Sequence, residues 1–231
     1  MISFIENNIG TIVLVAALAA SIPIAIFLRE MIEIKSQRDA GLFGVMLMFL
    51  GTRCIGFFYQ LCGWIMPGIL HSGVFGIFCF GVIVVWLLSK LMRRNFGKML
   101  DFFAILMALY GALNRVCCLV NGCCSGVNFG RASLSWPNRE LEVLFFFAAF
   151  VLLLLFRHKR KFTGQLFLLL MIGYGLFRFF NEFLSKGQEI LYVLKIAHIW
   201  SFLCVAIGFS VYVELNLRAD KLVNRKKHGG Y

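Results

Sequence analysis

Seven apolar stretches, each close to the length that a helix needs to cross a lipid bilayer, constrain this chain more than any other feature. A helix that spans the hydrocarbon core needs about 20 mainly apolar residues. The stretches cover residues 10–28, 41–65, 69–88, 99–113, 141–156, 164–184 and 192–213. Since 61% of the 231 residues are hydrophobic and only 15% are charged, a soluble domain is excluded. We predict an all-α polytopic membrane protein with seven transmembrane helices.

Basic residues between these stretches predict how the chain is oriented. Most of the 23 Lys and Arg residues fall within residues 29–38, 90–98, 157–161 and 218–227, which an alternating topology places on one side. Cytoplasmic loops of membrane proteins carry an excess of such cations. We therefore expect the N-terminus outside and the C-terminus in the cytoplasm. One transmembrane domain is expected over residues 1–217, followed by a basic cytoplasmic tail over 218–231. The net charge of +12 is explained by these segments and does not indicate nucleic-acid binding.

The segment 114–126, NRVCCLVNGCCSG, is the first candidate for a functional site. It follows the fourth apolar stretch directly and contains Arg115, two asparagines and four of the eight cysteines. Polar groups at the edge of a bilayer are costly unless they have partners, so they indicate function. In the predicted topology this segment, His71 and Arg178 all lie on the outer side of the membrane.

Arg53, Arg178 and Glu182 are charged residues inside or near the end of apolar stretches. We expect Arg53 to face the interior of the helix bundle and to meet a lipid phosphate or a buried acid. The alternative is a structural ion pair, for example with Asp101 or Glu182. Arg178 and Glu182 are four residues apart, so they share one helix face and are expected to pair. A guanidinium held in this way suits bidentate recognition of a phosphate, and the alternative is a self-satisfied pair near the interface.

His71 and the cysteines are the remaining reactive side chains of the predicted outer side. His71 is a candidate general base at the start of the third stretch, or else a hydrogen-bonded bystander. The spacing Cys-Cys-x4-Cys-Cys matches zinc sites poorly. These cysteines are expected to pack as small apolar residues or to form disulfides, and a metal site or catalytic thiol is the remaining alternative. We predict no cofactor and no bound metal. The four cysteines are Cys117, Cys118, Cys123 and Cys124.

Several short segments, in this order along the chain, resemble the bacterial prolipoprotein diacylglyceryl transferases. The family pattern Gly-Arg-x-Gly-Asn-Phe-x-Asn-x-Glu-x-x-Gly lies over residues 114–126 and matches at Arg115, Asn121 and Gly126. The family's arginine followed four residues later by glutamate resembles Arg178 and Glu182, after a similar approach at residues 174–179. Weaker likenesses lie at residues 51–59, at 71–73, which resemble a His-Gly-Gly segment, and at Pro137 with Glu142.

The resemblance implies transfer of a diacylglyceryl group from phosphatidylglycerol to the cysteine thiol of a preprolipoprotein, with glycerol-1-phosphate as the leaving group. The implied catalytic residues are His71, which would help to deprotonate the thiol, and Arg115 and Arg178, which would hold the phosphate. Glu182 would orient Arg178. The implied location is the bacterial cytoplasmic membrane, with the active face outward. The substrate-binding residues would be Arg53, Arg115, Asn121, Gly126, Arg178 and Glu182.

The chain also departs from the family pattern. Cys123 stands where the family has its signature glutamate, and Cys118 stands where it has its signature asparagine. Ser72 replaces the middle residue of His-Gly-Gly, His198 stands where a glutamine is usual, and residues 10–28 lack the expected tyrosine. We expect the fold to carry over. Two alternatives to the family reaction are transfer from a phospholipid to another acceptor, and a non-enzymatic redox-linked or metal-linked protein that uses the cysteine pairs.

Overall fold

The computed structural model describes residues 2–65, 74–120, 137–184 and 195–228, and every regular element within these ranges is helical. The all-α prediction is therefore confirmed for the described chain. The elements, in order, are α1 (Ile2–Phe27), η1 (Arg29–Ile32), α2 (Gln37–Ile65), η2 (Ile77–Gly81), α3 (Val82–Leu91), α4 (Phe96–Val120), α5 (Asn138–Phe156), α6 (Gln165–Phe183) and α7 (Ile196–His228).

Five of the described helices, α1, α2, α4, α6 and α7, are long and apolar enough to cross a membrane. α5 has 19 residues but carries Arg139, Glu140 and Glu142 in its first turns. The π-helical segment η2 and α3 together make a shorter apolar helix over residues 77–91. Large apolar side chains such as Leu144 and Phe147 of α5 and Phe202 of α7 are exposed on the outside of the bundle. This pattern fits a multi-pass membrane protein, and the exact count of seven spans stays a prediction.

Two helices run further than the apolar stretches indicate. α4 continues to Val120, so Arg115, Cys117 and Cys118 are helical. α7 continues to His228 through the segment expected as a basic tail. Its last turns are rich in residues that favour helix, and Glu214 pairs with Arg218 one turn later. Both α4 and α7 therefore continue as helix into the polar residues that follow their apolar stretches.

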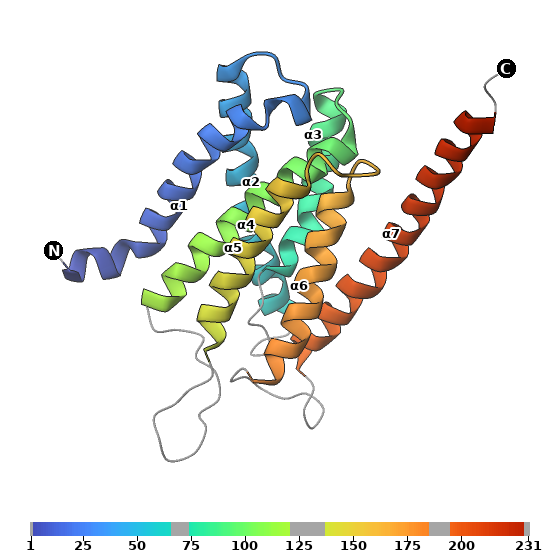
Figure 1. Ribbon diagram of the computed structural model, residues 1–231. Helices are drawn as coiled ribbons and strands as arrows, with labels where there is room; N and C mark the ends of the chain where they lie inside the picture. The colour runs from blue at the N-terminus through green and yellow to red at the C-terminus, as the bar shows by residue number, and fades with distance from the viewer. Residues whose placement is uncertain (1, 66–73, 121–136, 185–194, 229–231) are drawn as a thin grey trace.

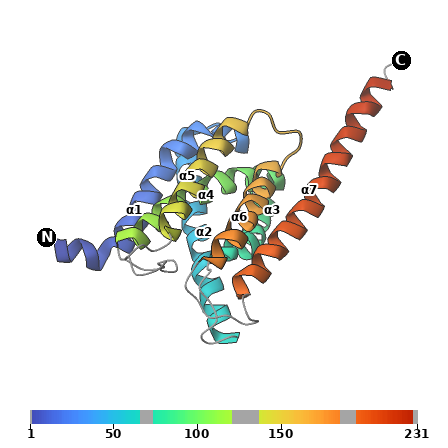
Figure 2. The same ribbon diagram turned by 60° about the horizontal axis from the view of Figure 1, so that its bottom comes forward.

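α4 is the central helix of the bundle. It contacts α1, α2, α3, α5 and α6, and its residues from Met99 to Ala108 are all buried. α5 and α6 lie beside it, while α7 packs on α6 over its first half and then leads away from the bundle (Figures 1 and 2). Because α4 and α6 run in the same direction, both bring their C-terminal ends to one end of the molecule, where α5 and α7 begin.

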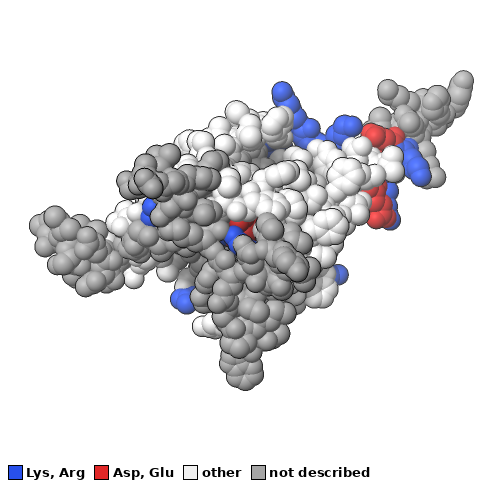
Figure 3. Space-filling view, turned by 90° about the horizontal axis from the view of Figure 1, so that it is seen from below, with Lys and Arg blue, Asp and Glu red and all other residues white. Residues whose placement is uncertain are grey.

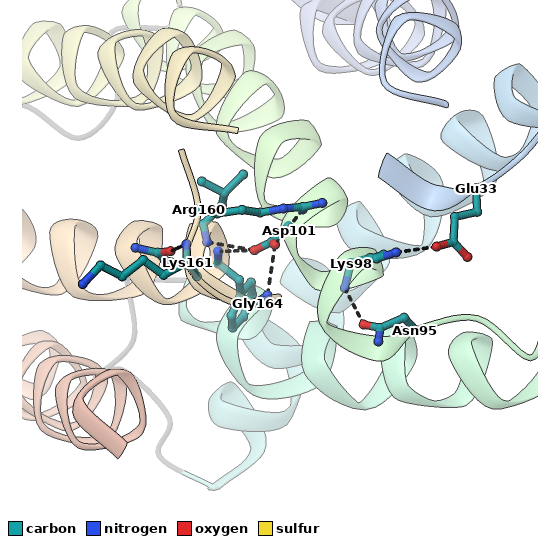
Figure 4. A network of polar contacts seen from close by, with 10 residues as sticks. Glu33, Asn95, Lys98, Asp101, Arg160, Lys161 and Gly164 are labelled. Carbon is teal, nitrogen blue, oxygen red and sulfur yellow. Dashed lines mark hydrogen bonds and ion pairs between the residues drawn. The ribbon is translucent and has the colours of Figure 1, made fainter. Parts of the chain in front are cut away.

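Asp101 fixes the opposite end of the bundle. Its buried carboxylate, on α4, accepts hydrogen bonds from the backbone N–H groups of Gly164 at 2.9 Å and Leu166 at 2.8 Å, at the start of α6. It also pairs with Arg160 at 3.0 Å (Figure 4). The first N–H groups of a helix have no partner within the helix, so one acid satisfies them and fixes the α5–α6 turn on α4. Gly164, with φ of 93°, makes the left-handed turn that this requires.

A second polar contact at this end joins η1 to α4. Lys98 donates to the carboxylate of Glu33 (Figure 4), and Arg94 donates to the Glu33 backbone oxygen at 2.8 Å. The Lys98 hydrogen bond and its charge, with a smaller contribution from Arg94, hold the pKa of the exposed Glu33 carboxyl below its usual value. The described basic turns at residues 29–38, 90–98 and 157–161 thus share one end of the bundle.

Replacing Asp101 should destabilise the protein more than replacing its cationic partner. Asp101→Ala leaves buried N–H donors without an acceptor at about 1–3 kcal/mol each, so we expect a loss of roughly 3 kcal/mol or more in the free energy of unfolding. Arg160→Ala removes only the partly exposed ion pair and is the matched control. Thermal unfolding midpoints in detergent compare the two, and equal shifts would contradict this role of Asp101.

Candidate active site

Four buried charged side chains form a continuous chain at the end of the bundle where α4 and α6 finish. Arg115 Nε lies 2.6 Å from one carboxylate oxygen of Glu142. The other oxygen of Glu142 accepts a hydrogen bond from Arg178, whose second terminal nitrogen lies 2.5 Å from Glu182. Glu142 is 2% exposed, Arg178 4% and Arg115 7%. One carboxylate therefore bridges two arginines from different helices.

Seen from this end, acidic and basic atoms lie side by side near the middle of the view (Figure 3). Leaving one partner of a buried ion pair alone costs about 3–5 kcal/mol. Charged residues at this depth in a membrane protein are expected to mark a substrate pathway or site. The arrangement therefore requires all four members and is a candidate functional site.

A glycine one turn before Arg115 lets α4 and α5 approach closely. A Cβ on Gly111 would meet the ring of Phe146 at 2.6 Å, so the aromatic ring lies directly on the α4 backbone. Arg115 follows Gly111 by four residues, and Glu142 precedes Phe146 by four. Since residues four apart share a helix face, this contact brings the arginine opposite the glutamate. Small residues serve this purpose in membrane helix packing.

Gly175 has the same role between α6 and α7. A Cβ there would lie 2.8 Å from Val205 and 3.0 Å from the backbone oxygen of Ser201. Arg178 follows Gly175 by three residues, and His198 precedes Ser201 by three. The start of α7 is therefore held against the charged end of α6. The two glycine contacts place groups from α4, α5, α6 and α7 around one point.

Further buried polar groups surround the charged chain. Asn181 of α6 donates a hydrogen bond to Asn138 at the start of α5. Lys195 Nζ donates to the backbone oxygen of Glu182 at 2.8 Å, which adds a cation at the end of α6. The buried Nε–H of Arg178 has no acceptor within the described chain. A guanidinium with a vacant buried donor suits an oxyanion ligand better than a purely structural ion pair does.

The predicted pairing of Arg178 with Glu182 is confirmed, and Arg115 lies in the same cluster. The expectation that Arg53 faces the bundle interior was wrong. Arg53 is exposed on α2, and its guanidinium lies 4.7 Å from the ring centroid of Phe49. The two acids suggested as its partners pair with other arginines: Asp101 pairs with Arg160, and Glu182 pairs with Arg178. His71, Asn121, Gly126, Cys123 and Cys124 lie outside the described residues.

Glu142 is the member of the site that was not predicted from the sequence. It appeared only in a weak likeness around Pro137. The spacing along α5 could have indicated it, because residues four apart share a helix face. The structure buries one such row, which consists of Asn138, Glu142 and Phe146. Charge balance could also have indicated a further acid, because the two cations Arg115 and Arg178 need more than the single carboxylate of Glu182. Lys195 and the pair Asn138–Asn181 were also missed.

The described cysteines give no metal site. No group of three or more His, Cys, Asp or Glu side chains lies together among the residues that the structure describes. Cys118 is placed one turn after Arg115, with its Sγ 3.9 Å from a terminal nitrogen of that arginine. Cys118, which stands at the position of the family asparagine, therefore lies directly beside Arg115, a candidate phosphate-binding residue.

An apolar groove runs along α7. It has a volume of about 710 Å³, and residues from Trp200 to Leu215 of α7 form one wall. The other wall comes from η2, the start of α3, the first turns of α4 and α6, and the turns that precede those two helices. Phe78 lines the groove and contacts the ring of Tyr174, which precedes Arg178 by one turn. The groove thus extends from the end of the bundle near Gly97 and Gly164 to Phe78 and Trp200, and Phe78 is its link to the helix that carries Arg178.

Glu142→Gln tests whether one carboxylate holds both arginines. The amide keeps the size of the side chain but removes the charge, so two buried guanidinium groups compete for Glu182. We expect a loss of about 3–5 kcal/mol in the free energy of unfolding, measured in lipid nanodiscs. Glu140→Gln, which changes an exposed acid on the same helix, is the control. Equal small effects of the two substitutions would show that the cluster does not depend on Glu142.

Comparisons with known proteins give the family. A family model described as prolipoprotein diacylglyceryl transferase matches residues 8–214. Relatives named phosphatidylglycerol--prolipoprotein diacylglyceryl transferase occur in Clostridioides difficile and Dehalococcoides mccartyi. The first is 29% identical over 64% of this chain and 60% of its own length, and the second is 26% identical over 69% and 68%. A third, from Campylobacter hominis, is 26% identical over 80% of this chain and 74% of its own. The resemblance identified from the sequence is thus confirmed, and the chain belongs to the prolipoprotein diacylglyceryl transferase family.

Proposed function

We propose that this protein transfers a diacylglyceryl group from phosphatidylglycerol to the cysteine thiol of a prolipoprotein, as the names of its relatives state for them. Family membership supports the activity, and the alignment spans 60% of the C. difficile relative. The observation that carries the proposal is the pair of buried arginines, Arg115 and Arg178, joined by the carboxylate of Glu142. These two cations meet at one end of the bundle, and Arg115 belongs to the family motif.

The electrostatics of the cluster suit a phosphodiester. Glu142 and Glu182 balance the charges of Arg115 and Arg178, and Lys195 adds one further positive charge among the described residues. A phosphodiester carries one negative charge, and its oxygens accept hydrogen bonds from the fork of a guanidinium. The Nε–H of Arg178, without an acceptor in the described chain, provides one such donor. Because the donors are fixed by Glu142 and Glu182, they need little reorganisation when charge develops on the leaving group.

The proposed reaction is a displacement at the glycerol carbon that carries the phosphate. The thiolate of the acceptor cysteine forms a carbon–sulfur bond, and the carbon–oxygen bond to phosphate breaks. Glycerol-1-phosphate leaves with the bonding electron pair, and its phosphate oxygens stay beside Arg115 and Arg178. The thiol proton passes to a base, a role that we assign to His71. Asn121 and Gly126 are proposed as further substrate contacts, on the strength of their match to the family motif.

The apolar groove beside α7 is proposed to hold acyl chains of the donor. Its wall carries apolar residues such as Leu203, Ile207 and Val211. A phospholipid that lies with its chains there has its headgroup directed past Tyr174 toward Arg178. Arg53, exposed on α2, is proposed to contact lipid phosphate from the membrane side, where its charge and the Phe49 ring suit a headgroup.

We further propose that the charged cluster faces the outer side of the cytoplasmic membrane. The basic turns lie at the other end of the bundle, and such turns favour the cytoplasmic side. With this orientation a secreted preprolipoprotein meets the cluster after translocation. The chain then has the multi-pass topology expected for seven spans, with its N-terminus outside and the C-terminal end of α7 in the cytoplasm.

A transfer assay with purified protein tests the activity. The substrates are phosphatidylglycerol with labelled acyl chains and a peptide that contains a lipoprotein cysteine. We expect transfer by the wild-type protein, and a loss of about 10²–10³-fold in Arg115→Ala and Arg178→Ala, the range for removal of one fixed donor to a developing anion. Arg38→Ala, which removes an exposed arginine at the opposite end, is the control with unchanged rate.

Two results would contradict the proposal. Transfer that survives in both Arg115→Ala and Arg178→Ala would show that the arginines do not hold the donor. Absence of transfer by folded wild-type protein that still binds phosphatidylglycerol would show that the acceptor or the reaction has changed in this branch. Transfer to a different thiol or hydroxyl acceptor in the same assay would identify the changed acceptor.

A further inference from the structure

His198 is a buried polar residue that the reaction described above does not use. It is 2% exposed, in the first turn of α7. Its imidazole ring packs against Phe183, with ring centroids 4.3 Å apart, and edge-on against Phe179 at 5.3 Å. The ring lies within electrostatic range of the charges of Glu182, Lys195 and Arg178. His198 is therefore part of the charged cluster, held in one orientation by two aromatic side chains of α6.

The hydrogen bond at Nδ1 decides which ring nitrogen carries the proton. The backbone N–H of Lys195 donates to His198 Nδ1 at 3.0 Å. A ring nitrogen that accepts a hydrogen bond has no proton, so the imidazole is neutral and its proton is on Nε2. In this form Nε2 is a hydrogen-bond donor and cannot take a proton from a thiol. His198 thus has the wrong tautomer for a general base acting through Nε2.

The donor at Nε2 has no acceptor among the described residues. Nε2 is buried and makes no hydrogen bond to this part of the chain, like the Nε–H of Arg178 in the same cluster. Two donors cannot satisfy each other, and each buried donor left unpaired is costly. A ligand that brings oxygen acceptors satisfies both. Such a ligand is the phosphodiester headgroup already inferred at Arg178.

Resting on the proposed function, we propose that His198 is a donor-binding residue whose Nε2–H donates a hydrogen bond to an oxygen of the phospholipid headgroup held at Arg178. The neutral imidazole adds a directed hydrogen bond without adding charge. Its Nδ1 contact to Lys195 and its packing on Phe179 and Phe183 fix the direction of Nε2 before the lipid arrives. Binding therefore costs little side-chain entropy, which raises affinity for the donor.

Three substitutions separate the functions of the two ring nitrogens and of the ring itself. Asn places an amide oxygen near the position of Nδ1, so His198→Asn keeps an acceptor for Lys195 and removes the donor at Nε2. Gln places an amide nitrogen near the position of Nε2, so His198→Gln keeps the donor. His198→Phe keeps the ring packing and removes both polar atoms. The three variants therefore separate the Nδ1 acceptor that caps the start of α7, the Nε2 donor and the apolar ring.

The experiment measures Kd for phosphatidylglycerol and the KM values for phosphatidylglycerol and for the acceptor peptide in transfer. A hydrogen bond to a charged group corresponds to about a 10–100-fold change in affinity. We expect His198→Asn and His198→Phe to raise Kd and KM for phosphatidylglycerol by that amount, with the peptide KM unchanged. His198→Gln should stay close to wild type. If His198→Asn does not fold, the comparison of His198→Phe with His198→Gln carries the same test.

The opposite order overturns the inference. Wild-type affinity in His198→Asn with loss in His198→Gln would show that the residue only caps the start of α7. Wild-type affinity in His198→Phe would show that the ring is an apolar spacer. Failure of the transfer reaction itself is distinguishable, because the Kd measurement needs no turnover. A His198-dependent Kd without transfer would support the headgroup contact and contradict the proposed reaction.

Discussion

The structure of the site depends on one shared carboxylate. Glu142 touches Arg115 with one oxygen and Arg178 with the other, so the ends of α4, α5 and α6 are joined by a single side chain. Two guanidinium groups repel each other at close range, and this repulsion is strongest where water is excluded. Glu142 allows the two cations to lie close together, and Glu182 holds the far side of Arg178. The proposed phosphate-binding geometry is therefore fixed by carboxylates of the protein itself.

The same principle explains how the site can lack the acid of the family motif. Cys123 stands at the position of that glutamate, but the described arginines already have carboxylate partners on α5 and α6. Cys118 likewise places a thiol beside Arg115 where an amide is usual. The charge balance of the two arginines thus rests on helices α5 and α6, outside the cysteine-rich segment. The proposed activity rests on this charge arrangement and on family membership.

Ion pairs of the site could be predicted from the sequence only where both partners lie on one helix. Arg178 and Glu182 were paired correctly because residues four apart share a helix face. Glu142 was missed because its two partners come from other helices, a contact that the helix spacing of α5 does not show. Arg53 was placed wrongly because an apolar stretch does not show which face is buried. Phe49, Arg53 and Phe57 are all exposed on α2, so the arginine belongs to the membrane-facing side. The helical class was predicted correctly, and so was the gathering of Arg115 and Arg178 at one end of the bundle.

Arg115, Glu142 and Arg178 are proposed to act as one unit on the donor phosphate. A double-mutant cycle in kcat/KM for diacylglyceryl transfer tests it most directly, with Glu142→Gln, Arg178→Lys and the double variant compared on folded protein. The lysine introduced by Arg178→Lys keeps the charge but has no fork for Glu142 to orient. If the residues act as a unit, the double variant is no slower than the slower single variant, because effects within a unit are not additive. Losses that multiply in the double variant would contradict the account.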